Sequence, residues 1–184
     1  MKIAINAGHG PKNNGLYDPG AVGPSGLTEA SQNLKVATLL LAELKAAGYI
    51  CLLIHDGDLD DVIAKTNAWG ANYFVSIHAN GFPDPRVRGV ETYAWLPGGQ
   101  AEKLALAIQK ELVRITGQVD RGVKSANFRV LKYTNCPAVL VEAGFISNPE
   151  TERMMREGNF AEKVAQAVFN GLQKFIISNK KEIF

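Results

Sequence analysis

Three stretches of the chain repeat apolar residues at helical spacing. Apolar positions separated by steps of three and four residues fall on one face of an α-helix. The three stripes are Leu34, Ala37, Leu41 and Leu44; then Leu104, Ile108, Leu112 and Ile115; then Val164, Val168, Leu172 and Phe175. Gly48 follows the first stripe and Gly117 follows the second, and glycine commonly ends a helix. The pattern therefore predicts three long helices, and it favours a shorter one over residues 60–70.

Short apolar runs of strand length lie between these stripes. They occupy residues 2–6, 49–54, 73–77, 89–95, 129–131 and 138–141. Several are almost continuously apolar, which is typical of strands covered on both faces. Strands that alternate with helices predict an α/β fold. We expect three layers, with helices on both faces of a mostly parallel or mixed central sheet of about six strands.

Two segments are too rich in glycine and proline for regular structure. Residues 8–26 hold six of the 18 glycines and three of the eight prolines, and residues 79–88 contain Pro83 and Pro85. Long loops in compact domains are usually functional or disordered. No repeat or linker divides the 184 residues, so we expect a single domain over residues 1–178 and a short polar tail over residues 179–184.

Composition and charge exclude several classes of protein. The chain is 46% hydrophobic and 21% charged, as in soluble globular proteins. Its net charge is +2 and it has no long run of Lys or Arg, so we expect no nucleic-acid partner. It has no apolar run long enough to span a membrane, and the apolar start is too short for a signal peptide. Cys51 and Cys136 form no CxxC pair, which leaves them as small buried hydrophobes.

Polar residues follow three of the predicted strands. Ligands of open α/β sheets bind beyond the carboxyl ends of the strands. His9 follows the first strand, His78 ends the third, and Glu142 ends the last, while Glu29 opens the first helix after the glycine-rich loop. Catalytic zinc usually takes three protein ligands, often two His and one Glu, and a further carboxylate then moves the proton of the attacking water. Two histidines and two glutamates are enough for three ligands and one base.

Each of these residues also has a structural interpretation. His78 alone would fit a hydrogen-bonded structural histidine, and Glu29 alone would fit a first-turn carboxylate favoured by the helix dipole. His55 ends the second strand, and spacing alone does not exclude it in place of either other histidine. Asp18 and Asp84 lie in loops from which they could also reach a metal. The ligand set is therefore open on spacing alone.

Four segments together carry a family resemblance. They read NAGHG at residues 6–10, GAVG and then GLTE within residues 20–29, FVSIHAN at residues 74–80, and PAVLVEAGFISNP at residues 137–149. In this order, with GVET at residues 89–92 and RGVK at residues 121–124 between them, they resemble the zinc-dependent N-acetylmuramoyl-L-alanine amidases of bacteria and phages, the amidase 3 family. The resemblance runs from residue 3 to about residue 175. The chain departs from it at Asn6-Ala7, where the family usually has Asp-Pro.

The resemblance implies a ligand set and an activity. It makes His9, Glu29 and His78 the ligands of one Zn²⁺ per chain and Glu142 the general base, and it leaves His55 outside the site. The implied reaction is hydrolysis of the amide between N-acetylmuramic acid and the L-alanine of peptidoglycan. The implied protein is a monomeric catalytic amidase domain over residues 1–178 that degrades the bacterial cell wall, as an autolysin or an endolysin, by an export route that the sequence does not give.

Two other functions fit parts of this pattern. A zinc peptidase or deacetylase would use the same ligands and base on a different amide. A non-catalytic wall-binding module would keep the fold, but loss of Glu142 or of a ligand would then be expected, and all four residues are present. A purely structural α/β protein would leave the polar residues at three strand ends unexplained.

Overall fold

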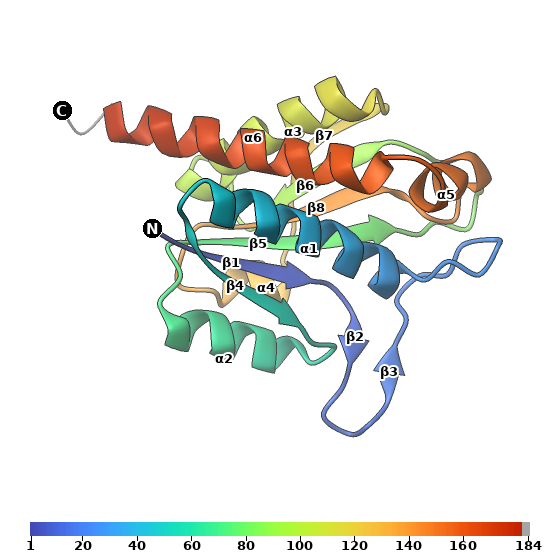
Figure 1. Ribbon diagram of the computed structural model, residues 1–184, viewed down its shortest axis with the longest axis horizontal. Helices are drawn as coiled ribbons and strands as arrows, with labels where there is room; N and C mark the ends of the chain where they lie inside the picture. The colour runs from blue at the N-terminus through green and yellow to red at the C-terminus, as the bar shows by residue number, and fades with distance from the viewer. Residues whose placement is uncertain (182–184) are drawn as a thin grey trace.

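A six-stranded sheet forms the centre of the computed structural model, which describes residues 1–181 (Figure 1). In spatial order the strands are β4 (Ile50–His55), β1 (Lys2–Ala7), β5 (Tyr73–Asn80), β8 (Ala138–Phe145), β6 (Val90–Ala94) and β7 (Asp120–Ser125). The first four are parallel, β6 runs antiparallel to β8, and β7 is parallel to β6. The expected mixed, mostly parallel sheet of about six strands is confirmed.

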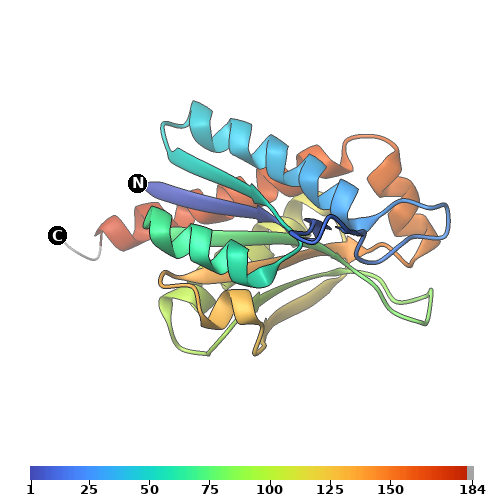
Figure 2. The same ribbon diagram turned by 90° about the horizontal axis from the view of Figure 1, so that it is seen from below.

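Helices cover both faces of the sheet, as the alternating pattern predicted (Figures 1 and 2). One face carries α1 (Glu29–Ala46), α3 (Gln100–Thr116) and α6 (Phe160–Lys181), and the other carries α2 (Leu59–Trp69) and α4 (Arg129–Lys132). The three long helices and the shorter helix over residues 60–70 are confirmed. None of the described helices combines the length and the apolar character needed to cross a lipid bilayer.

Alternation along each strand divides its apolar residues between two cores. Ile3 and Ile5 join the larger core under α1, α3 and α6, whereas Ala4 joins the smaller core under α2 and α4. Val139 and Leu140 divide in the same way on β8. Because successive side chains of a strand point to opposite faces, a strand covered on both sides must be apolar throughout. This explains the almost continuous apolar runs in the sequence.

The structure corrects the sequence prediction in four places. Residues 129–131, predicted as a strand, form the single helical turn α4, and the sixth strand is β7 instead. Helix α5 (Pro149–Arg156) was not predicted. The expected loop at residues 8–26 contains a small antiparallel ribbon of β2 (Gly10–Pro11) and β3 (Tyr17–Asp18). Helix α6 continues to Lys181, so it includes the first residues of the expected tail, and residues 182–184 of that tail lie outside the described residues.

Candidate metal and catalytic site

Three parallel strands bring the predicted polar residues to one edge of the sheet. Strand β1 lies beside β5, and β5 lies beside β8 with His78 opposite Glu142. His9 follows the end of β1, one residue after Gly8, whose backbone N–H bonds to the carbonyl of Ile77. The carboxyl ends of adjacent parallel strands therefore place His9, His78 and Glu142 close together, as the sequence predicted.

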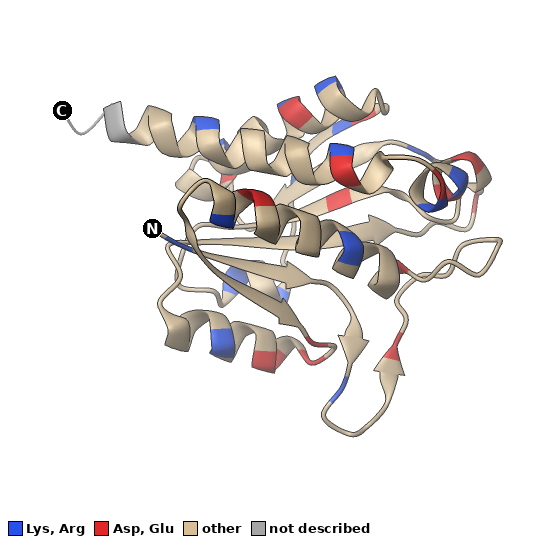
Figure 3. Cartoon of the chain, viewed as in Figure 1, with Lys and Arg blue, Asp and Glu red and all other residues tan. Residues whose placement is uncertain are grey.

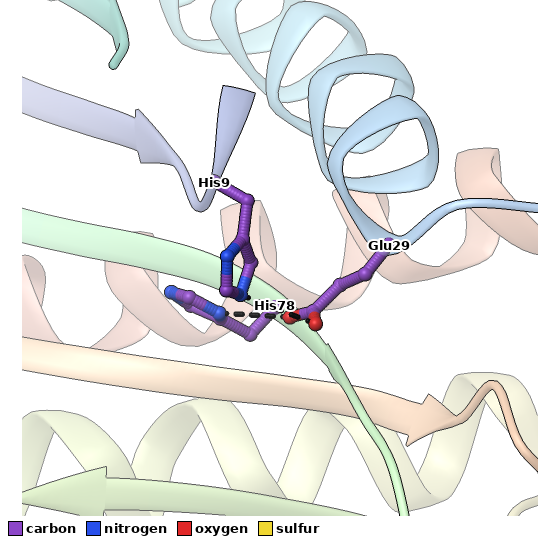
Figure 4. Close-up of side chains that lie close together, drawn as sticks. All are labelled: His9, Glu29 and His78. Carbon is purple, nitrogen blue, oxygen red and sulfur yellow. Dashed lines mark hydrogen bonds and ion pairs between the residues drawn. The ribbon is translucent and has the colours of Figure 1, made fainter. Parts of the chain in front are cut away.

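The two imidazoles lie edge to face, and the carboxylate of Glu29 points toward both of them (Figure 4). Its Oε2 is 3.2 Å from Nε2 of His9, and its Oε1 is 2.9 Å from Nδ1 of His78. One ligand atom from each of these three residues lies within 4.8 Å of the others. Two imidazole nitrogens and a carboxylate that converge in this way form a group able to hold a metal ion, and they match a common set of zinc ligands.

Backbone groups from two distant segments fix the carboxylate of Glu29. Helix α1 begins at this residue, after Thr28, whose side chain accepts a hydrogen bond from the backbone N–H of Ser31. The Glu29 side chain is turned inward, and it accepts backbone hydrogen bonds from Ala21, 2.9 Å away, and from Ala79, 3.1 Å away. Burial alone would raise the pKa of Glu29, but hydrogen bonds from His78 and His9 lower it overall. Glu29 is therefore an ionised carboxylate held in place, and its position is not explained by the helix dipole alone.

The backbone of His9 adopts a conformation that few side chains tolerate. Its φ of 64° lies in the left-handed region, and no other non-glycine residue among residues 1–181 has a positive φ. Such a conformation costs of order 1 kcal/mol or more and is common at functional sites. It turns the imidazole back toward Glu29, whose hydrogen bond raises the pKa of His9 to about 9.

Asp18 is placed behind His9 and not among the three convergent residues. It lies on β3, and its Oδ2 is 3.0 Å from Nδ1 of His9, so it fixes the ring whose Nε2 faces Glu29. Histidines that bind metals usually donate their second N–H to such an acceptor, which orients the ring. The glycine-rich loop thus supplies a support for one candidate ligand. Asp84, the other loop carboxylate considered, pairs with the neighbouring Arg86.

Two glycines allow the histidines to pack against the backbone. A Cβ atom at Gly8 would lie 2.2 Å from the ring of His78, and one at Gly10 would lie 2.3 Å from Nε2 of His55. His55 therefore packs under the turn that carries His9, and it is not part of the convergent group. Its Nε2 is buried and has no hydrogen-bond partner among the described residues, and burial lowers its pKa. The structure favours the set of His9, Glu29 and His78 over any set that contains His55.

Glu142 has the surroundings of a proton-transferring carboxyl group. It lies opposite His78 on the neighbouring strand, and its Oε2 is buried without a hydrogen-bond partner in the described part of the chain. Burial raises its pKa well above the usual value, and the charges of Glu29 and Glu91 raise it further, whereas His9 lowers it. A carboxyl group with a raised pKa next to a possible metal centre can accept a proton from water and return it to a leaving group.

A cavity of about 690 Å³ opens beside the two histidines. It lies between the β2–β3 ribbon and the start of α2, and its lining includes His9, His78, Asn13 and Asp58. Asn13 ties the ribbon to this helix, because its backbone N–H donates to Asp58 and its side chain donates to Asp61. The cavity thus reaches the two histidines of the convergent group, whereas Glu29 and Glu142 are not part of its lining.

The sequence analysis did not predict the contact between α5 and the loop before Glu29. Glu152 on α5 accepts hydrogen bonds from the backbone N–H of Ser25, at 3.0 Å, and of Leu27, at 3.3 Å. It thereby fixes the loop that leads into Glu29. The pair Asn148-Pro149 is a helix-start signal, an N-cap residue before a proline in the first turn, and it would have predicted α5.

Comparison with known proteins identifies the family of the chain. The model of the family described as N-acetylmuramoyl-L-alanine amidase matches residues 3–174. Amidase LytC of Bacillus subtilis is 35% identical over 175 residues, which are 92% of this chain and 34% of LytC. The sporulation-specific amidase of the same organism is 33% identical over 181 residues, which are 95% of this chain and 68% of that protein. The chain thus spans about a third of LytC and two thirds of the sporulation-specific protein.

Solved structures agree with this result over almost the whole chain. The catalytic domain of CwlV, an N-acetylmuramoyl-L-alanine amidase of Bacillus (Paenibacillus) polymyxa var. colistinus, is 32% identical and superimposes with a TM-score of 0.88. That comparison covers 96% of this chain and 98% of the other. The amidase AmiC2 of Nostoc punctiforme is 27% identical, with a TM-score of 0.87 over 96% of this chain and 97% of the other.

Proposed function

The chain belongs to the amidase 3 family of N-acetylmuramoyl-L-alanine amidases, and from this premise we propose that it hydrolyses the amide bond between N-acetylmuramic acid and the L-alanine of peptidoglycan with the help of one zinc ion. The observation that carries the proposal is the convergence of His9, Glu29 and His78 beside Glu142. The proposed ligands are Nε2 of His9, Nδ1 of His78 and the carboxylate of Glu29. The proposed general base is Glu142.

The donor set fits zinc and not a hard cation such as magnesium. Imidazole nitrogens suit zinc, whereas magnesium prefers oxygen ligands in octahedral geometry. A zinc ion held by three protein ligands would supply Lewis-acid activation of a water molecule and of the amide carbonyl. The support of His9 by Asp18 is the kind of contact that orients metal ligands. All the proposed groups come from one chain, so the proposed catalytic unit is a monomer whose residues 1–178 form the catalytic domain.

The proposed reaction assigns two proton transfers to Glu142. Its carboxylate accepts a proton as the water oxygen forms a bond to the amide carbon. The carbon–nitrogen bond then breaks, and Glu142 gives the proton to the departing amine of L-alanine. The raised pKa of Glu142 suits the second transfer, because a stronger carboxylic acid would give up its proton to bulk water first. The products are a muramic acid with a free lactyl carboxylate and a peptide with a free amino terminus.

Digestion of purified peptidoglycan tests the proposal. Mass spectrometry should find peptides that begin with a free L-alanine amine and sugars that keep an intact lactyl carboxylate. A chelator should stop the release of both products, and added zinc should restore it. Cleavage between two amino acids, or release of acetate, would instead make the chain a peptidase or a deacetylase. If the protein acts at the cell wall, as its family does, it should also bind insoluble peptidoglycan.

A further inference from the structure

A buried carboxylate on β6 collects donors from three strands. Glu91 is only 2% exposed, and its oxygens accept hydrogen bonds from Nε of Arg121 at 2.8 Å, Nζ of Lys124 at 2.5 Å, the hydroxyl of Tyr93 at 2.6 Å and Nδ2 of Asn80 at 2.9 Å. A carboxylate offers about four lone-pair sites, so four donors satisfy it completely. We call Glu91, Arg121 and Lys124 the Glu91 cluster.

The Glu91 cluster holds more positive charge than Glu91 needs. One carboxylate faces two cations, which leaves a net charge of +1. Both cations also keep free donors: in the part of the chain that the structure describes, the two terminal nitrogens of Arg121 have no acceptor, and the ammonium of Lys124 bonds only to Glu91. Their side chains are 34% and 38% exposed, so these donors are accessible from solvent. The second cation is therefore not needed to neutralise Glu91, and in the described part of the chain neither cation hydrogen-bonds to Glu142, the carboxyl group opposite Glu91.

Packing holds the two cations in place. The guanidinium of Arg121 lies over the ring of Phe145, with its central carbon 4.8 Å from the ring centroid. The ammonium of Lys124 lies 5.8 Å from the centroid of Tyr93. Cations held by a buried carboxylate and an aromatic face lose less side-chain entropy when they bind a ligand than free surface cations do. The cluster is therefore organised before any ligand arrives.

The sheet register aligns the Glu91 cluster with the candidate site. His78 lies opposite Glu142, Glu142 lies opposite Glu91, and β7 with Lys124 follows as the edge strand. Residues directly opposite one another point to the same face of a sheet. Since adjacent strands are about 4.8 Å apart, the backbone of β7 lies roughly 10 Å from that of β8, and the cationic nitrogens, which contact Glu91 on the strand between, lie closer to Glu142 than that. An extended peptide rises about 3.4 Å per residue, so this span corresponds to at most about three residues.

We infer that Arg121 and Lys124, held by Glu91, bind a carboxylate of the peptide part of the substrate, within about three residues of the amide that is cut. The inference rests on the proposed function, because a muramoyl peptide places carboxylates in its peptide and not in its sugar ring. Arginine matches a carboxylate with two parallel N–H groups, and lysine adds a point charge. The site would favour substrates whose carboxylate is free over substrates in which it is amidated.

Matched substrates test this site. N-acetylmuramoyl dipeptides and tripeptides are prepared as free acids and as carboxamides, and kcat/KM is measured for each. We expect the zinc-loaded protein to prefer the acid by about tenfold at one of the two lengths, mainly through KM, as for one charge-assisted hydrogen bond. Arg121→Lys and Lys124→Gln should bring the ratio of acid to amide toward one. Arg121→Lys keeps a charge for Glu91, so it guards against simple unfolding.

Controls separate this inference from the proposed function. Arg153→Gln and Lys103→Gln remove exposed cations elsewhere and should leave the ratio of acid to amide unchanged. Equal turnover of acid and amide by the wild type at both lengths would overturn the carboxylate site and leave the amidase function standing. Failure to cut any of the four substrates would overturn the amidase function. In that case NMR tests the carboxylate site independently. The acid peptide, but not the amide, should shift the signals of the terminal N–H groups of Arg121, and the absence of this shift would overturn the site as well.

Discussion

Glu142 lies next to His78 with a buried oxygen that lacks a partner, and its pKa is raised chiefly by burial. Glu142→Gln keeps the size of the side chain and removes its ability to transfer a proton. We expect the variant to keep its melting temperature and zinc content and to lose about 10²- to 10⁴-fold in kcat. The exposed Glu150→Gln is the control and should keep its activity. A Glu142→Gln variant with near wild-type turnover would require a different base.

Asp18 offers a test of the support behind His9. Asp18→Asn keeps the shape of the side chain but removes the charge that faces Nδ1 of the ring. We expect zinc affinity to fall by about 10- to 100-fold, as for other carboxylates behind metal-bound histidines. Asp84→Asn, which changes a carboxylate paired only with its neighbour Arg86, serves as the control. Competition with a zinc indicator measures both affinities, and equal affinities would mean that Asp18 serves only the ribbon.

The sequence predicted which residues converge at the site, but it did not predict the packing contacts that exclude other candidate residues. On spacing alone His55 stayed an alternative, because β4 and β1 are neighbours and end at the same edge of the sheet, and only the family resemblance placed it outside the site. In the structure His55 packs against Gly10 and is not part of the convergent group. The segments GVET and RGVK, which contain Glu91 and its two cations, were part of the family resemblance, but the sequence analysis assigned these residues no role. The cations come from 30 and 33 residues away, and no local pattern reports such pairs.

At the scale of elements, the sequence correctly predicted the helices and strands whose buried apolar residues repeat with a regular period. It missed elements in which exposed or short segments hide that period. Helices α1, α3 and α6 pack on the larger core, so their apolar stripes are long and regular. Strand β7 is at the edge of the sheet and has the sequence DRGVKS, in which exposed polar residues hide the strand period. Val130 and Leu131 pack in the smaller core from the single helical turn α4. A pattern of only three residues is too short to tell a helical turn from a strand.

Helix α5 should control the loop that carries Glu29. Glu152→Gln weakens the hydrogen bonds that Ser25 and Leu27 donate to the carboxylate. We expect the exchange of these two amide protons with solvent to speed up by roughly tenfold, since hydrogen bonds to charged groups are the strong ones. Zinc affinity should fall in parallel. Glu157→Gln, an exposed change just after the same helix, should alter neither, and unchanged exchange in Glu152→Gln would show that the loop is held by its own turns.

At the scale of the whole molecule, the residues that stabilise the fold and the residues of the candidate site occupy different parts of the sheet. Its two apolar cores lie above and below the strands, whereas His9, Glu29 and His78 converge at the carboxyl ends of the strands, with His9 just past β1 and His78 among the last three residues of β5. The loop before α1 donates a hydrogen bond to the carboxylate of Glu29, and α5 in turn holds that loop through Glu152. The charged residues are spread over the outer surfaces of the helices and the loops, and the parallel strands carry few (Figure 3). A ligand can therefore be lost without loss of the fold.

Zinc should stabilise the whole chain through this edge, and Glu29 should be required for the effect. A ligand present at a thousand times its Kd stabilises the folded state by about 4 kcal/mol, which for a domain of this size raises Tm by roughly 10 °C. Calorimetry with zinc and with a chelator measures the shift.

Glu29→Ala should lose most of this shift in Tm, although the helix-dipole contribution that the substitution removes is only about 0.3–1 kcal/mol. Glu102→Ala removes the first-turn carboxylate of α3, away from the convergent residues, and should keep the full shift. If Glu29→Ala kept it as well, Glu29 would be an ordinary helix-start residue, and the third ligand would have to come from another carboxylate at the same edge, with Asp18 the nearest to His9.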